Sequence, residues 1–524
     1  MTLFLRFFFV AGMVLWAAAA RAEIRLPSII GDNMALQADK AVPIWGWGSA
    51  GETVAVAFQG HHVSGLVDAE GRWSVMLPAL RVDATGQTLT VVSGENEVAV
   101  GNVVVGDVWL ASGQSNMALE VEQSDRAEEE IAAATHPTIR LFTVKQAVAV
   151  AGPLADCEGR WVECAPETVG AFSAVGYFFA RDLQATLDRP VGVIHSSWGG
   201  TKAKVWLPQA ALDERPELQV INDAWAAELA DYPRAKAEFD AHFPALQTEW
   251  EAVAAAAIAA GKAPPAGPRL RTGPNSQYVP AALYNAMIAP LIPYGLSGYI
   301  WYQGESDVGA PQLYAETLVA LAHSWRGGWQ DPSLAFICVQ LPNIDRQPEP
   351  SRSGWAELRE AQLKLLSVPD TALVVTIDVG DPGSVHPTHK QPVGHRVALA
   401  AQALVHGADR TRTLSPVPRA WATEGDAMRI RFDHVADALR TSDGGEGRGF
   451  VVAGPDRIFH PAQVRLAGDG VVVSSPMVPQ PAAVRYGWAD NPPCNIVDGA
   501  GLPVTPFRTD TWATPALVAH ELDK

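Results

Sequence analysis

The sequence predicts an α/β protein whose central parallel sheet is flanked by a β-rich region at each end of the chain. Three observations predict this class. Between residues 106 and 407, five apolar runs are each followed by a helical stretch or a long loop, the pattern of a parallel sheet covered on both faces. Short alternating runs separated by turn residues come before position 106. Similar short runs return after position 408.

The first 22 residues indicate an export signal and are set aside from the fold. Arg6 is followed by an apolar stretch from Phe7 to Ala20 and then by Ala20-Arg21-Ala22, an A-x-A cleavage pattern. A membrane span needs about 20 apolar residues, so an uncleaved anchor is the weaker alternative. We therefore expect a mature chain of residues 23–524 that is periplasmic or secreted and free of the membrane.

The composition narrows the class of partner. The 524 residues include 39 Lys and Arg against 57 Asp and Glu, a net charge of −18, with 48% hydrophobic residues. This is the composition of a globular protein, and a chain of this length should form two to four domains. Grooves that follow phosphates need clustered Lys and Arg, which this sequence lacks, so we expect no nucleic-acid partner.

The chain divides into consecutive regions. Residues 23–105 predict an N-terminal β-sandwich, because turn signals recur about every 8 to 12 residues. Residues 106–407 predict the α/β unit, and residues 408–524 a C-terminal β-rich region. Within the α/β unit the apolar strands are GDVWLAS, RPVGVIHSSW, GLSGYIWYQG, LAFICVQLP and TALVVTID, and helices are expected near 124–134, 311–325, 355–367 and 390–405.

A helical insertion interrupts the α/β unit at about residues 209–270. Apolar residues recur there at spacings of three, four and seven, which predicts a helical stripe. Pro233 and Pro244 should break or kink it, so two or three helices packed as a hairpin are expected rather than one rod. Two roles stay open for the insertion. It either forms one side of a substrate cleft, or it is a surface insertion that packs its apolar stripe against itself.

Four cysteines are too few for a disulfide scaffold. Cys157 and Cys164 flank six residues, so an oxidising compartment would allow a local disulfide between them, but the sequence leaves open whether they are bonded. Cys338 lies in the apolar run AFICVQL and is expected to be a packed thiol, and Cys494 has no evident partner.

The strongest chemical signal is GDVWLASGQSNM, residues 106–117, in which an apolar strand runs into a turn of small residues. This places Ser115 at the carboxyl edge of the sheet, where open α/β folds build their sites. A lone serine in a turn is usually a helix cap. The G-x-S-x-G nucleophile motif is absent, because Asn116-Met117 follow Ser115.

GQSNM resembles the nucleophile block of the SGNH hydrolases, and further stretches resemble the sialate O-acetylesterase and carbohydrate acetylesterase branch of that superfamily. This resemblance extends over nearly the whole mature chain and implies a flavodoxin-like, three-layer parallel sheet. The other stretches are HSSWGGTKAKVWLP (195–208), YIWYQGESD (299–307), DVGDPGSVHPTHKQPVGHRVALA (378–400), the opening LPSIIGDNMALQ and the closing RYGWADNPPCNIVDGAGLPVTPFRTD.

The resemblance implies that Ser115 is the nucleophile of an acyl transfer. The oxyanion hole would combine the Ser115 backbone N–H, that of Gly199 or Gly200, and the side-chain amide of Gln303. Glycine lets a backbone approach an acyl oxygen closely, and glutamine supplies a neutral donor. Many SGNH hydrolases carry asparagine where this chain has Gln303.

His386 would be the general base. Most relatives place an aspartate three residues before this histidine, where this chain has Gly383, so the orienting acid is open. Asp381 and Asp378 are nearest in sequence, and Asp381 is preferred. A Ser115–His386 dyad helped by a backbone carbonyl is the other option.

Two alternatives in the same segments are weaker. A zinc site could use the imidazoles of His386, His389 and His395. However, Pro387 breaks the helix that would align them, and the sequence has no H-E-x-x-H pattern. We therefore expect no catalytic metal, and the esterase reaction needs no cofactor. Glu305 and Asp307 resemble a glycosidase carboxylate pair but are neighbours in one loop rather than on two sides of a bond.

Several residues beside the catalytic blocks are candidates for contact with a sugar. Aromatic rings stack on sugar faces but more often pack in the core, so both roles stay open for them. The candidates for substrate contact are Asn116, Trp198, Trp206, Trp301 and Glu305, with Tyr302 as a further aromatic neighbour.

The sequence thus predicts an exported serine esterase that removes O-acetyl groups from a carbohydrate. Acetylated xyloglucan, xylan and sialic acid are all candidate substrates, and the acidic charge favours neutral glycans. A non-catalytic glycan-binding protein on an inactive SGNH scaffold and an esterase for non-sugar esters are the alternatives. The oligomeric state is not predicted.

Overall fold

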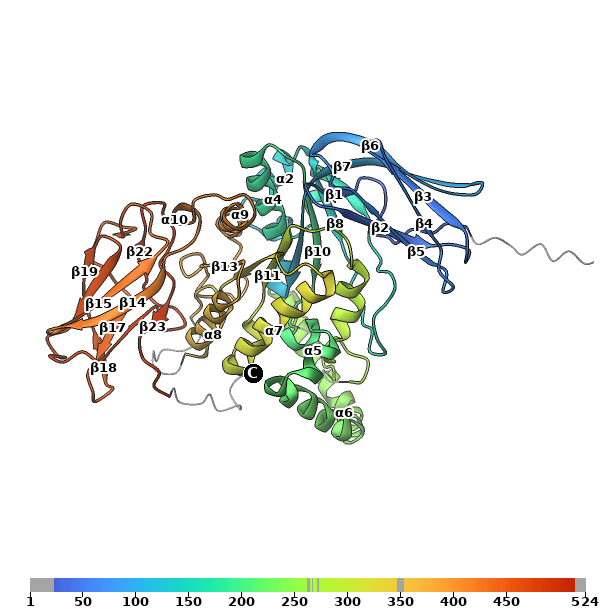
Figure 1. Cartoon of the computed structure of the whole chain (residues 1–524). Coiled ribbons are helices and arrows are strands. Elements are labelled where there is room, and N and C mark those ends of the chain that lie inside the picture. Colours follow the sequence, from blue (N-terminus) through green and yellow to red (C-terminus); the bar gives the residue numbers. More distant parts are fainter. Residues whose placement is uncertain (1–22, 262–263, 266, 271–272, 346–352, 514–524) are drawn as a thin grey trace, which may run out of the picture.

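The computed structural model describes residues 23–261, 264–265, 267–270, 273–345 and 353–513 (Figure 1). A β-rich N-terminal part (blue) and a β-rich C-terminal part (orange to red) lie on either side of a central α/β part. The predicted export signal, residues 1–22, lies outside the described residues. Within the described ranges, no helix has both the length and the apolar character that a membrane crossing requires.

A mixed sheet forms the middle of the α/β part. Its strands follow the order β13-β12-β11-β7-β10-β8-β9, and every neighbouring pair is parallel except β8 with β9. β10, β11 and β12 are buried along their whole length, which explains their continuous apolar sequences. The strands are β7 (Asn96–Gly113), β8 (His136–Thr143), β9 (Trp161–Cys164), β10 (Val191–Ser197), β11 (Gly298–Tyr302), β12 (Ala335–Val339) and β13 (Thr371–Val374).

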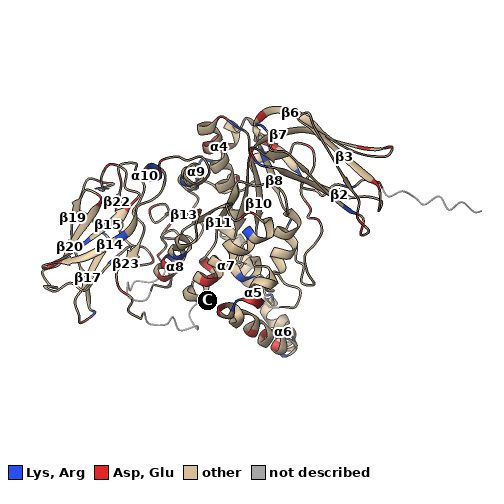
Figure 2. Ribbon diagram, in the orientation of Figure 1, with Lys and Arg blue, Asp and Glu red and all other residues tan. Residues whose placement is uncertain are grey.

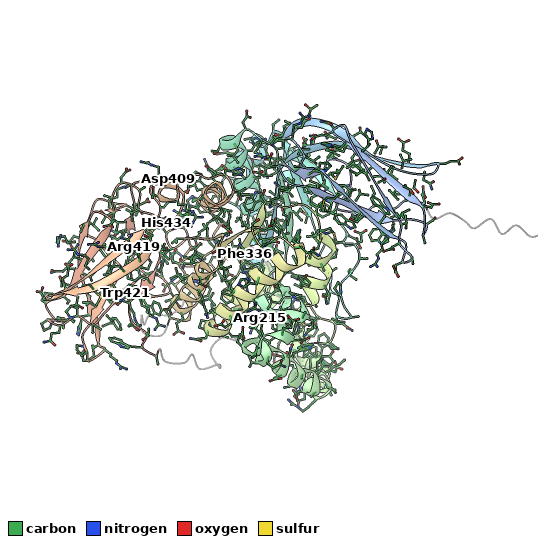
Figure 3. All side chains as sticks on the ribbon, in the orientation of Figure 1. Arg215, Phe336, Asp409, Arg419, Trp421 and His434 are labelled. Atoms are coloured by element: carbon green, nitrogen blue, oxygen red, sulfur yellow. The ribbon has the colours of Figure 1, made fainter. Side chains whose placement is uncertain are left out.

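Helices cover both faces of this sheet, as the sequence predicts. α4 and α9 pack together over one apolar core, which includes Phe178 and Val397, whereas α7 and α8 pack over the other, with Leu318 and Leu358. Phe336 of β12 is fully buried in the middle of the molecule (Figure 3). The four expected helices are present as α2 (Ala127–Ala133), α7 (Pro311–Trp329), α8 (Gly354–Leu363) and α9 (Gln391–Val405).

The strand order corrects the flavodoxin-like expectation. In that order the first parallel strand lies between the second and the third. Here β10, the third, lies between β7 and β8, paired with β7 over Val191–Ser197 and with β8 over Val191–His195. β8 and α4 (Ala174–Leu187) were not predicted from the sequence. Strand order depends on pairing between distant segments, which the hydrophobic pattern of one strand does not encode.

The N-terminal part contains two sheets. β1, β3, β4 and β6 extend the sheet of β7, and β2 pairs with β5 separately. The first half of β7 pairs with β6, and its second half pairs with β10 and β11. The expected boundary between residues 105 and 106 therefore falls inside one continuous strand. The strands are β1 (Ala35–Gln37), β2 (Val42–Trp47), β3 (Thr53–Phe58), β4 (His61–Leu66), β5 (Arg72–Leu77) and β6 (Asp83–Ser93).

The C-terminal part is β-rich, as predicted. It has a core of its own, and the buried Arg359 of α8 donates to the carbonyls of Ala489 and Asp490 and so ties it to the α/β part. Its elements are α10 (Arg410–Thr413), β14 (Val417–Glu424), β15 (Ala427–Asp433), β16 (Arg440–Thr441), β17 (Phe450–Ala453), β18 (Phe459–Pro461), β19 (Gln463–Ala467), β20 (Gly470–Ser474), β21 (Ala483–Tyr486), β22 (Ile496–Val497) and β23 (Phe507–Arg508).

The insertion is less broken than the sequence predicts. After α5 (Gln209–Glu214), α6 (Gln219–Ala259) runs through Pro233 and Pro244 as one helix of 41 residues, which corrects the expected hairpin. Each proline removes one N–H from the helical ladder, but α6 is largely exposed, so water can bind the freed carbonyls. Charged residues lie along it (Figure 2), and ion pairs such as Lys236–Asp240 support it.

The four cysteines carry free thiols, so Cys157 and Cys164 are not bonded to each other, a point that the sequence leaves open. Cys157 belongs to the apolar core on one face of the central sheet and Cys164 to the core on the other. Burial raises the pKa of both thiols to about 12. Cys338 is fully buried in β12, which confirms the predicted packed thiol.

Replacing Pro244 with alanine should strengthen α6. A proline inside a helix costs up to about 3 kcal/mol relative to alanine, because it lacks an N–H and its ring crowds the preceding turn. We expect slower amide hydrogen exchange along residues 240–250, measured by mass spectrometry. Ala245→Gly, the matched control at the next position, should accelerate exchange. Unchanged or faster exchange in Pro244→Ala would mean that the helix does not run through this proline.

Candidate active site

Ser115 stands where β7 ends. α1 (Ser115–Ala118) begins two residues after Gly113, the last residue of β7. Gly113 has a φ of 140°, and a Cβ on it would lie 2.1 Å from the carbonyl oxygen of Tyr302, so only glycine fits there. The N–H of Gln114 donates to the same carbonyl at 3.0 Å. This junction leaves Ser115 partly exposed at the carboxyl edge of the sheet.

His386 is the closer of two side chains that bond to the hydroxyl of Ser115, the other being Gln114 at 3.5 Å. His386 Nε2 lies 2.7 Å from Ser115 Oγ, although the two residues are 271 positions apart. His386 stands in the loop between β13 and α9 and is exposed. Partial burial of the imidazole and the nearby charge of Lys390 lower the pKa of His386. The ring is therefore neutral at pH 7, the form that accepts a proton from a hydroxyl.

The loop after β10 approaches Ser115 closely. The last residues of β10 and β11 pair with Gly113 of β7, so the three carboxyl ends are level. A Cβ on Gly199 would lie only 3.3 Å from the Cβ of Ser115. In the part of the chain that the structure describes, the backbone N–H groups of Ser115, Gly199 and Gly200 have no hydrogen-bond acceptor. These donors are available to an oxyanion.

Gln303 corrects part of the predicted oxyanion hole. Its side chain is fully buried, and its Nε2 donates to the carbonyl of Thr201 at 3.1 Å and to Asp307 Oδ2 at 2.6 Å. Both amide N–H bonds are therefore used, and none remains for an oxyanion. Gln303 instead ties the loop of Gly199 and Gly200 to the loop after β11. The sequence shows that Gln303 carries an amide donor, but it does not show which acceptors this amide bonds to.

The structure does not bring Asp381 to His386. Asp381 is exposed, and its Oδ1 accepts from the backbone N–H of Gly383 at 2.8 Å. Asp378 forms a two-bond ion pair with Arg396, with both N–O distances 2.7 Å. Within the described residues, no carboxylate is hydrogen-bonded to His386, so the arrangement is a Ser115–His386 dyad.

Asn116 and Glu305 bond to each other, which corrects Asn116 as a substrate contact. Asn116 is fully buried, and its Nδ2 donates to the Glu305 carboxylate and to the carbonyl of Val385 at 2.8 Å. Its Oδ1 accepts from Lys390 Nζ at 2.6 Å. Lys390 was not predicted as a site residue, and its only signal in the sequence is its place in the same motif block as His386.

Two of the three candidate tryptophans are core residues, which favours the core role over sugar stacking, the two roles that the sequence leaves open. Trp206 and Trp301 are fully buried and pack edge to face, with ring centroids 6.2 Å apart. Trp198 is partly exposed and precedes Gly199 directly, so it stays a candidate for stacking on a sugar. Aromatic residues near strand ends pack inward when a helix covers that face, as α7 does here.

The histidines of the base loop are separated. His395 Nδ1 lies 2.9 Å from the carboxylate of Asp182, whereas His386 contacts Ser115. The described residues contain no group of three His, Cys, Asp or Glu side chains placed to hold a metal ion.

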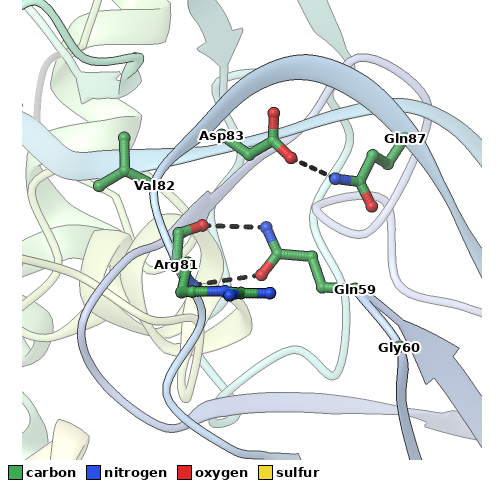
Figure 4. Close-up of a pocket in the computed structure, with 6 residues that line it drawn as sticks. All are labelled: Gln59, Gly60, Arg81, Val82, Asp83 and Gln87. Atoms are coloured by element: carbon green, nitrogen blue, oxygen red, sulfur yellow. Dashed lines mark hydrogen bonds between the residues drawn. The ribbon is translucent and has the colours of Figure 1, made fainter.

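A hollow of about 510 Å³ in the N-terminal part contains neither Ser115 nor His386 (Figure 4). Its polar groups bond to one another: Gln59 Nε2 donates to the carbonyl of Arg81 at 2.9 Å, and Gln87 donates to Asp83. The lining residues are Gln59, Gly60, Arg81, Val82, Asp83 and Gln87. The edge that carries Ser115 therefore remains the candidate active site.

A serine hydroxyl bonded to a neutral histidine, with free backbone N–H groups beside it, is typical of hydrolases that cleave acyl esters. Comparisons with known proteins agree with this class. The profile of a family described as carbohydrate esterase, sialic acid-specific acetylesterase, matches residues 105–227 and 274–404. The unmatched residues between these ranges include most of α6, so this helix lies outside the matched family core.

Relatives with known activity match most of the chain. The sialate O-acetylesterases of Rattus norvegicus and Homo sapiens are 30% and 29% identical to it, over 75% and 78% of this chain and 76% of each relative. The crystal structure of a carbohydrate acetylesterase from Xanthomonas citri has a TM-score of 0.78 and 35% identity, covering 93% of this chain and 100% of that one. The chain belongs to the sialate O-acetylesterase family and is a carboxylic ester hydrolase.

Asp381→Asn should lower kcat far less than His386→Ala. Asparagine can still accept from the N–H of Gly383, and Asp381 does not contact the base, whereas His386→Ala removes the group bonded to Ser115. Initial rates with p-nitrophenyl acetate measure both. Equal losses in the two variants would make Asp381 a full member of a triad.

The acidic limb of the pH profile of kcat/KM should lie below the ordinary histidine pKa of about 6.5. The base works when unprotonated, and its lowered pKa extends the neutral form to lower pH. Stopped assays between pH 4 and 9 on an ester whose leaving group does not titrate measure this limb. A limb above pH 7 would contradict it.

Proposed function

We propose that this protein is an exported serine esterase that removes O-acetyl groups from carbohydrates through an acyl-enzyme on Ser115. The observation that carries the proposal is the 2.7 Å contact between Ser115 Oγ and His386 Nε2 at the carboxyl edge of the sheet. Export is inferred from the leader at residues 1–22.

In the first half-reaction, Ser115 Oγ attacks the carbonyl carbon of the acetyl group while His386 Nε2 takes the hydroxyl proton. The carbonyl oxygen becomes an oxyanion. The free backbone N–H groups of Ser115, Gly199 and Gly200 donate hydrogen bonds to it. The bond between the acyl carbon and the sugar oxygen then breaks. The imidazolium returns its proton to that oxygen, and the sugar leaves as an alcohol.

In the second half-reaction, water attacks the acetyl-serine ester. His386 takes a proton from the water, and the same backbone donors hold the second oxyanion. The bond between the acyl carbon and Ser115 Oγ breaks, and the proton passes from His386 to Oγ. Acetate leaves, and no cofactor is consumed.

Neutral acetylated glycans are the proposed substrates, with hemicellulose fragments such as xyloglucan or xylan preferred over sialic acid. The chain carries a net charge of −18, which repels an anionic sugar. This effect is weak, because salt screens exposed charges beyond about 8 to 10 Å. The Xanthomonas citri relative is described as a carbohydrate acetylesterase, whereas the mammalian relatives are described as sialate O-acetylesterases.

Acetate release from a panel of acetylated xyloglucan, xylan and sialic acid tests the proposal. Wild-type protein should release acetate from the neutral glycans, and Ser115→Ala should lower the rate about 1000-fold or more. Ser367→Ala, an exposed serine outside the site, is the matched control and should keep full activity.

Other results would point elsewhere. Tight glycan binding without release of acetate by the wild type would support a binding protein on an inactive scaffold. Hydrolysis of p-nitrophenyl acetate with none of the glycans as substrate would support an esterase for non-sugar esters. Release from sialic acid alone would overturn the preference for neutral glycans.

A further inference from the structure

A buried polar cluster lies next to the two catalytic side chains. Lys390 Nζ donates to Asn116 Oδ1 at 2.6 Å, and Asn116 Nδ2 donates to the Glu305 carboxylate and to the carbonyl of Val385 at 2.8 Å. The amide of Asn116 therefore stands between a cation and an anion. We call Lys390, Asn116 and Glu305 the lysine cluster.

The lysine cluster is costly to bury. Lys390 and Asn116 have no exposed surface, and burial lowers the pKa of Lys390 to about 7. Burial also raises the pKa of Glu305, whose second carboxylate oxygen is buried and has no partner within the described residues. Buried charges add little net stability compared with apolar side chains of similar size. Such an arrangement calls for a reason other than stability.

The charges allow one orientation of the Asn116 amide. Its oxygen faces the ammonium of Lys390, and its nitrogen faces two acceptors. Rotating the amide by 180° would place N–H groups against the lysine and an oxygen against the Glu305 carboxylate and the Val385 carbonyl. Lys390 thus holds the amide in the orientation that keeps its bond to Val385.

This bond connects the two halves of the dyad. Asn116 directly follows the nucleophile Ser115, and Val385 directly precedes the base His386. The Asn116–Val385 hydrogen bond joins the β7 turn to the base loop one residue away from each reacting side chain. A family pattern with an aspartate three residues before the base would orient the imidazole directly, but this chain has Gly383 there.

We propose that Lys390, acting through Asn116 and the Val385 carbonyl, is the positioning residue for the His386 base and replaces the missing orienting carboxylate. This inference rests on the proposed function in assigning His386 as the base. Lys390 touches neither substrate nor reacting atoms and acts only by fixing the base loop and by its charge.

The charged and titratable groups that face Lys390 come from three segments. Glu305 lies in the loop after β11, the ring of Tyr302 at the end of β11 is 5.2 Å from Lys390 Nζ, and His386 belongs to the same loop as Lys390. Burial first, and the nearby ammonium second, lower the pKa of His386. Removing the ammonium should raise that pKa, because the imidazolium then no longer meets a neighbouring cation.

The test compares Lys390→Met with wild type. We expect kcat to fall about 10- to 100-fold with KM nearly unchanged, because misplacing a catalytic group by about 1 Å costs up to about 100-fold in rate. The acidic limb of the pH profile should move to higher pH. Lys236→Met, which removes an exposed lysine of α6, is the matched control and should change neither.

A measurement without substrate separates this inference from the proposed function. Nuclear magnetic resonance of histidine-labelled protein, with the His386 signal assigned from His386→Ala, gives the pKa of His386 even if no ester is hydrolysed. A higher pKa in Lys390→Met supports the inference. An unchanged pKa overturns it, because a merely structural lysine would lower kcat without moving the pKa of His386. An unchanged kcat in Lys390→Met also overturns it.

A second variant guards against misfolding caused by the unpaired Glu305. Lys390→Met/Glu305→Gln buries no net charge, and its cooperative melting would show that it is folded. The inference expects the low kcat of Lys390→Met to persist there. We also expect Asn116→Ala alone to lower kcat as much as the double variant Lys390→Met/Asn116→Ala, because Lys390 acts only through Asn116. Wild-type kcat in the folded double variant, or losses that add, would overturn the inference.

Discussion

The contact between Ser115 and His386 depends on a constraint of parallel sheets, whose strands all end on one edge. β7 lies between β10 and β11 in the sheet, and the ends of the three strands are level. The loops after β10 and β11 therefore start beside Ser115, whereas the loop of His386 follows β13, three strands away in the sheet, and returns along the same edge to reach Ser115. The contact spans 271 positions in sequence but only one edge of the sheet in space. Gly113 makes the arrangement possible, because a side chain there would collide with the backbone of β11.

Buried polar side chains hold the loops around Ser115 in place, because these loops extend beyond the backbone hydrogen bonds that join neighbouring strands. A buried polar group costs free energy unless it is hydrogen-bonded, so pairing two loops through one buried amide makes both hard to displace. Gln303 joins the Gly199 loop to the loop after β11, and Asn116 joins the β7 turn to the base loop. Both amides lie near the Ser115–His386 pair, yet both are buried and support the candidate site rather than line it.

The C-terminal part reaches the base loop through a short connecting segment. The N–H of Ile344 donates to the carbonyl of Asp490 at 3.2 Å, and the N–H of Asp345 donates to the carbonyl of Pro382 at 2.9 Å. Asn343 Oδ1 accepts from the N–H of Gly380 at 2.8 Å. The C-terminal part is therefore connected by hydrogen bonds to the segment that precedes His386. These hydrogen bonds connect the C-terminal β-region to the α/β part that carries Ser115 and His386.

The sequence by itself determined the class of the fold and the chemical groups of the dyad. Apolar runs as long as β10 and β11 indicate strands buried on both faces, and the motif blocks place Ser115 and His386 in the turns that follow strands. Local pattern is enough for these features, because burial and turns depend on neighbouring residues. It was not enough for the strand order, the continuous helix α6, the free Cys157 and Cys164, or the roles of Gln303, Asn116 and Trp301. Those depend on which distant segments pack together. Only the tertiary structure decided that the Asp381 carboxylate accepts from Gly383 rather than from His386, and that Lys390 bonds to Asn116. The first depends on how the loop itself folds, and the second on packing between segments that the sequence keeps far apart.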